Sequence, residues 1–117
     1  MLMAIPLPLQ QLIDQLNSEL DESEQETIEG LNLVRGLLSR FPDNALLIQF
    51  FAYFNNVLLF VDNYKTQTQN TAELLSVSDV TAEQIREAGE DLSSILGRVI
   101  ETKIEVISII NRLQRLQ

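Results

Sequence analysis

Three acidic residues in the last third of the chain have a spacing that could hold a cation. Glu87, Glu90 and Asp91 fall on adjacent positions of one helix face if this segment is helical. Carboxylate-rich metal sites in helical bundles, however, also use a histidine three residues after a glutamate, and the chain has no histidine. Because carboxylates on helices are usually exposed to solvent, the sequence predicts a solvated acidic face here and no metal site.

The residues that most often do chemistry at neutral pH are missing, because the chain contains no His and no Cys. Ser, Thr, Lys and Tyr need a base and an orienting group to act as nucleophiles, and only carboxylates or lysines could supply them. For Lys65 and Lys103 we expect stems lying along apolar surface with the charged heads in water. No phosphate-binding glycine loop, EF-hand or zinc-protease motif is present in the sequence. These observations predict a protein that is not an enzyme, with no catalytic residues and no cofactor.

The acidic residues and lysines considered above lie in segments whose apolar spacing predicts long helices. In the last third of the chain, apolar residues occupy the a and d positions of five heptads. The a positions are Ile85, Leu92, Val99, Val106 and Leu113, and the d positions are Ala88, Ile95, Thr102, Ile109 and Leu116. Thr81 and Gln84 have capping-box spacing. The pattern predicts one helix from Thr81 to the C-terminus.

Prolines and caps divide the rest into two further arms. Pro8 suits the first turn of a helix that Pro42 ends. Ser23 and Glu26 also have capping-box spacing, which predicts a kink, or a break into two helices, near residues 21–23; we favour the kink. Asp43 or Asn44 can cap the central arm, which reaches Tyr64 or, if the polar stretch after it is helical, Leu75.

The predicted fold is therefore an all-α antiparallel bundle of three long helical arms, with three to four helices in one domain over residues 1–117. Residues 1–7 could form an extended N-terminal arm that docks on a neighbour, with a frayed terminus as the equal alternative. The first nine residues are apolar, contain Pro6 and Pro8 and lack a basic region, so they do not match a signal peptide.

Composition narrows the classes of partner. The chain is 45% apolar and 21% charged, which is typical of globular proteins. A net charge of -9 disfavours nucleic acid and anionic membranes unless a local basic patch exists, and the Lys and Arg residues are scattered along the sequence. The acidic band Glu19–Glu29 is expected to be a solvated face, with attraction of a basic partner as the alternative. The lack of cysteine fits a cytoplasmic protein.

The apolar block Ala45–Val61 is shorter than the roughly 20 residues that span a bilayer, and it contains three amide side chains. A buried helix is the better interpretation. Asn55 and Asn56 interrupt this block, and they either form a register-setting polar pair or leave at least one amide facing water.

Three rods cannot easily cover all the apolar surface of this chain. Ile100, Ile104 and Ile107 form a second stripe opposite the heptad seam, and exposing each would forgo about 1.5–3 kcal/mol. We therefore expect a homodimer, unless the kinked first arm covers the surplus. The candidate self-interface consists of Phe50, Phe51, Phe54, Ile100, Ile104 and Ile107.

The function expected from these features is a non-catalytic helical protein–protein interaction module, such as an adaptor, assembly factor or regulator, acting through apolar helix faces. One alternative is a carrier in which central aromatic residues line a pocket for a lipid or pigment. Another is peripheral membrane attachment, which lacks a basic flank in the sequence.

Gly89 and Gly97, eight residues apart, suggest a close helix crossing.

Overall fold

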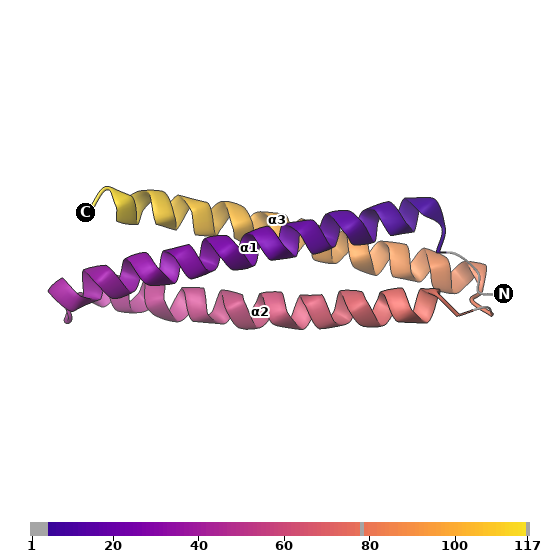
Figure 1. Cartoon of the computed structure of the whole chain (residues 1–117), viewed down its shortest axis with the longest axis horizontal. Helices are drawn as coiled ribbons and strands as arrows, with labels where there is room; N and C mark the ends of the chain where they lie inside the picture. The colour runs from indigo at the N-terminus through magenta and orange to yellow at the C-terminus, as the bar shows by residue number, and fades with distance from the viewer. Residues whose placement is uncertain (1–4, 78, 117) are drawn as a thin grey trace.

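Three long helices make up the computed structural model, which describes residues 5–77 and 79–116. They are α1 (Leu7–Arg40), α2 (Ala45–Leu75) and α3 (Ala82–Gln114). α1 and α3 run in the same direction and α2 runs antiparallel to both (Figure 1). The bundle is a rod with extents of 59 × 19 × 18 Å. The predicted all-α bundle of three arms is confirmed.

Local sequence accounts for the helix ends. Pro8 lies in the first turn of α1, and the helix stops at Arg40, two residues before Pro42. The Asn44 side chain accepts a hydrogen bond from the Leu47 backbone N–H at 3.0 Å. Thr81 and Gln84 form the predicted capping box, with reciprocal bonds of 3.1 and 2.9 Å. These contacts satisfy backbone groups that the helix itself leaves unpaired.

The first arm is one uninterrupted helix, as favoured, and the alternative of a break into two helices near residues 21–23 is wrong (Figure 1). Ser23 is only 1% exposed and lies among the buried residues of α1. Its backbone carbonyl accepts a hydrogen bond from the Thr27 hydroxyl at 2.6 Å. An N-cap needs a non-helical backbone, and burial of this face in the bundle holds Ser23 within the helix instead.

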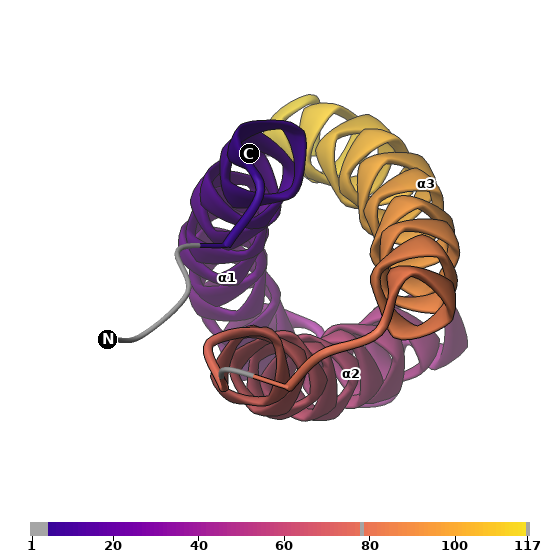
Figure 2. The same ribbon diagram turned by 90° about the vertical axis from the view of Figure 1, so that its right-hand side faces the viewer.

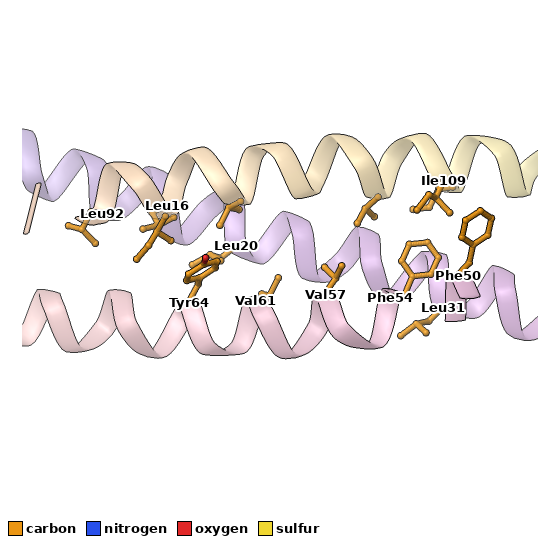
Figure 3. Close-up of a cluster of buried hydrophobic side chains, with 14 of the residues drawn as sticks. Leu16, Leu20, Leu31, Phe50, Phe54, Val57, Val61, Tyr64, Leu92 and Ile109 are labelled. Atoms are coloured by element: carbon orange, nitrogen blue, oxygen red, sulfur yellow. The ribbon is translucent and has the colours of Figure 1, made fainter. Parts of the chain in front are cut away.

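The core runs along the common axis of the three helices, which surround it in a triangle (Figure 2). Fully buried side chains come from all three helices and include Leu16, Leu20, Phe54, Val61 and Leu92 (Figure 3). Most predicted heptad positions of α3 are buried; Ile85 and Thr102 are half-buried and Leu116 is exposed. α1 packs extensively against both other helices, whereas α2 and α3 meet over fewer residues.

A glycine makes room for the largest fully buried side chain. A Cβ atom at Gly30 would lie 2.7 Å from Cζ of Phe54, so the absence of a side chain on α1 lets the aromatic ring of α2 enter the core. At Gly89 a Cβ would lie 3.3 Å from Leu9, but at Gly97 nothing lies within 4 Å. Within this chain the close approach therefore involves Gly89 and not Gly97.

The predicted N-terminal arm falls partly outside the described residues, because positions 1–4 are not among them. Ile5 packs against the core, and Leu7 is already the first residue of α1.

Candidate interaction surfaces

The six residues of the predicted self-interface separate into two groups. Phe50 is 9% exposed and Phe54 is fully buried within the chain's own core. These two therefore do not contribute to an exposed face, and this part of the prediction is corrected. Three rods suffice to cover them because Gly30 gives the Phe54 ring space beside α1. Phe51 is half-buried, with the Arg35 guanidinium 5.8 Å from its ring centre.

The three isoleucines lie on the surface of α3. Ile100 is 37%, Ile104 63% and Ile107 38% exposed, so α1 leaves them uncovered. Exposed small residues continue the same side of the helix, giving an uncharged surface that we name the isoleucine stripe: Ser93, Gly97, Ile100, Ile104, Ile107 and Ser108.

The predicted asparagine pair is not a pair of buried amides. Asn55 is half-buried, and its side-chain nitrogen donates to the Phe51 carbonyl of its own helix at 3.0 Å. Asn56 is exposed. The alternative, in which at least one amide faces water, describes the structure. A register-setting role within this single chain has no support from these contacts.

Two lysines tie the acidic band of α1 to the neighbouring helices. Lys65 of α2 lies 3.1 Å from Asp21 and 3.0 Å from Glu24. Lys103 of α3 pairs with Glu19 at 3.2 Å and also with Glu22. Hydrogen bonding to these carboxylates raises the pKa of both lysines. The heads of Lys65 and Lys103 are thus paired with carboxylates, and part of the predicted solvated face joins helices.

Glu26 lies beside this cluster. One carboxylate oxygen of Glu26 is buried without a hydrogen-bond partner among the described residues. Burial raises the pKa of Glu26, nearby Glu22, Glu19 and Glu29 raise it further, and Lys103 opposes them.

The fold segregates charge along the rod. We name residues 30–61 and 106–116 the arginine end, because their charged residues are Arg35, Arg40, Arg112, Arg115 and Asp43. The rest of the chain, which we name the acidic part, has sixteen acidic and four basic residues. The net charges are therefore +3 and -12. The arginine end is not visible in the sequence, because its arginines come from the C-terminal ends of α1 and α3. These helices run parallel, so both C-terminal ends lie at the same end of the rod, at the left of Figure 1.

The cations of the arginine end pair differently from the two lysines. Arg35, Arg40 and Arg112 lie 5.8, 5.7 and 5.5 Å from the ring centres of Phe51, Phe41 and Phe50. Within residues 5–77 and 79–116, no carboxylate forms an ion pair with any arginine of this end. Cation–π contacts leave the positive charge uncompensated.

Apolar side chains are exposed beside these arginines. Phe41 is 53%, Leu46 43% and Leu116 57% exposed. Phe41 and Leu116 also line one hollow with Leu37, Asn44 and Leu47. Ile48 of α2 is also exposed, at 51%.

A groove between α2 and α3 is the nearest match to the predicted ligand pocket. Tyr53, Val57 and Phe60 of α2 face Thr102 and Glu105 of α3 across about 200 Å³. Ligand pockets usually have about 300–1,000 Å³. Burial, together with Glu105, raises the pKa of Tyr53, which favours the neutral phenol.

The acidic residues at the start of α3 pair locally. Arg86 forms ion pairs with Glu83 and Glu90 of its own helix. In the described part of the chain, no group of acidic side chains is arranged to hold a metal ion.

α2 is the one helix of the described chain that is long and apolar enough to cross a membrane, with a mean hydropathy of 1.5 in its most apolar window. Only 22% of that window is buried within the chain, so the predicted buried helix is corrected: α2 buries one face in the core and exposes Leu46, Ile48 and Leu59 on the other side. Length and hydropathy alone assign no membrane.

Comparisons with protein-family models, curated proteins and solved structures gave no match for this chain.

Proposed function

We propose that this protein is a non-catalytic helical interaction module that self-associates through the isoleucine stripe. The observation that carries the proposal is the exposure of Ile100, Ile104 and Ile107 on a long helix that otherwise buries its apolar residues. A second copy would remove their remaining exposed area, which is 37–63% of each side chain. Since burying a fully exposed side chain gains about 1.5–3 kcal/mol, each isoleucine would contribute about 0.5–2 kcal/mol.

Charge favours this stripe over the acidic surface of the rod. Two chains of net charge -9 repel each other, so a self-contact needs a surface without acidic residues. The six residues of the isoleucine stripe carry no charge, and exposed Glu101 lies at its edge. Because salt screens the remaining repulsion, self-association should strengthen as ionic strength rises.

Gly97 lies within the isoleucine stripe, where it leaves room for a partner helix. It is an exposed glycine in the middle of α3 with open space where a Cβ would be. Such a glycine costs about 1 kcal/mol of helix stability relative to alanine, and nothing in the chain's own packing requires it. Close approach of a partner helix would explain it.

The test is the mass in solution, measured by light scattering on a sizing column up to about 1 mM protein, where even weak association is visible. We expect twice 13.3 kDa. Ile104→Lys should weaken dimerisation about 100-fold or more, because it replaces buried apolar area with a charge. Leu59→Lys is the matched control, since Leu59 is 66% exposed on α2, and it should leave the mass unchanged.

A second pair separates helix stability from association. Gly97→Ala should raise the melting temperature of the monomer yet weaken the dimer. Gly36→Ala, also with nothing within 4 Å of its added Cβ, should raise stability without changing association. A monomer at every concentration, or equal effects of Ile104→Lys and Leu59→Lys, would overturn the proposal.

A further inference from the structure

The arginine end combines two properties that the rest of the surface does not combine. It carries four arginines whose charges are not compensated by carboxylates within the described residues. It also exposes Phe41, Leu46 and Leu116 at the end of the rod. The ion pairs of the acidic part show that this fold can neutralise cations where carboxylates are near.

We propose that the arginine end is a docking surface for an anionic phospholipid bilayer, with the rod standing end-on. A guanidinium group donates paired N–H bonds to phosphate or carboxylate oxygens of lipid headgroups. Phe41, Leu46 and Leu116 can enter the boundary between headgroups and acyl chains, where apolar and aromatic side chains are favoured. This surface provides the basic flank that the sequence pattern conceals.

The acidic part does not prevent this approach, because of the length of the rod. Glu29 precedes Arg40 by 11 residues along α1, which is about 17 Å of helix. Glu105 precedes Arg115 by 10 residues along the last part of the chain, which is about 15 Å of helix. Asp43 is the one acidic residue of the arginine end itself, and the net charge of +3 already includes it. The Debye length at physiological salt is only about 8 Å. In the end-on orientation, repulsion between the acidic part and the bilayer is therefore strongly screened, while the arginines lie near the surface.

A second copy of the chain fits this end less well. Asp21 and Glu24 of the acidic band are paired with Lys65, and Glu19 and Glu22 with Lys103. An acidic protein surface would also leave the exposed apolar side chains of the arginine end in water. A bilayer satisfies both the charges and the apolar groups, and this docking does not depend on self-association.

The experiment is co-sedimentation with sucrose-loaded vesicles of phosphatidylcholine containing about 30 mol% phosphatidylserine, compared with phosphatidylcholine alone. Arg40→Gln/Arg115→Gln should lower the partition coefficient about 30-fold, since each basic residue near an anionic surface contributes about fivefold. Arg86→Gln/Arg98→Gln makes the same charge change in the acidic part and should change binding less than about threefold, because its sites lie beyond screening range.

Two further arms complete the test. Phe41→Ser/Leu116→Ser changes no charge and should also weaken binding, which separates apolar insertion from a purely ionic contact. Raising salt from about 0.1 to 0.5 M should release the protein, whereas a helix inserted across the bilayer would stay.

Equal binding to neutral vesicles, no binding to either vesicle, or equal losses in the two arginine double variants would overturn the proposal. A change in the mass of the free protein on Arg40→Gln/Arg115→Gln would assign these arginines to a protein contact instead and would also overturn it.

Discussion

The acidic part and the arginine end share one apolar core but differ in the partners of their cations. Three of the four cations in the acidic part form ion pairs, whereas no arginine of the arginine end does so within the described residues. In the acidic part, Lys65 and Lys103 bridge α1 to its neighbours through carboxylates. At the arginine end, Arg35, Arg40 and Arg112 lie over aromatic rings. The former arrangement uses charge to join helices, and the latter leaves charge available at the surface. Whether a basic side chain joins helices or remains available at the surface thus depends on where it lies along the rod, and not on where it lies in the sequence.

The largest effects should come from the core that both regions share. Phe54→Ala, in the arginine end, should lower the free energy of unfolding by about 3–5 kcal/mol, and Leu92→Ala, in the acidic part, by about 2–5 kcal/mol. Both side chains are fully buried, so each truncation leaves a cavity. Urea unfolding followed by circular dichroism should give one transition for each variant. Two separate transitions in either variant would show that the regions fold independently and would break the comparison.

Intermediate effects should distinguish the two kinds of cation. Lys103→Met should lower the free energy of unfolding by about 1–2 kcal/mol, because it leaves the clustered carboxylates near Glu22 without their cation. Arg112→Met should cost less than about 1 kcal/mol, the usual range for an exposed cation–π contact. Thermal or urea unfolding at pH 7 measures both. If Arg112→Met were the more damaging change, the arginines would be structural and not available to a partner.

Much of the fold can be predicted from local sequence, because the decisive signals are local. Pro42, Asn44 and the Thr81–Gln84 capping box mark helix ends through backbone chemistry that operates within one turn. Ser23 and Glu26 have the same spacing but lie inside α1. The spacing alone cannot distinguish the two cases, since tertiary burial of Ser23 decides whether its backbone is helical.

The surfaces are harder to predict, because they depend on which helices lie together. From the sequence, Phe54 belongs to the apolar surface that three helices were not expected to cover. Only its contact with Gly30 in the structure shows that the chain can bury it. Arg35 and Arg112 are 77 residues apart, so the charged patch they help to form exists only once α1 and α3 run side by side. The exposure of Ile104, in contrast, follows from the heptad pattern, which places it away from the seam.

The smallest predicted effect concerns Glu26, a partly buried carboxylate whose charged form lowers the stability of the acidic part. Its pKa is raised by burial and by neighbouring carboxylates, so the folded state binds this proton more tightly than the unfolded state. The charged form therefore lowers stability above the raised pKa, and protonation relieves the penalty as pH falls. Glu26→Gln should therefore raise the free energy of unfolding at pH 7, by less than Lys103→Met lowers it.

The pH dependence makes this prediction specific. The gain from Glu26→Gln should shrink as pH falls from 7 toward the unfolded-state pKa of about 4.3, because the wild-type side chain then becomes neutral too. Glu101→Gln, an exposed change on α3 with the same charge difference, controls for the general benefit of lowering the net charge. Urea unfolding of the three proteins at several pH values measures both effects. If the gain for Glu26→Gln equals that of the control or stays constant with pH, Glu26 behaves as an ordinary surface charge. Burial of a carboxylate would then not distinguish the acidic part from the arginine end.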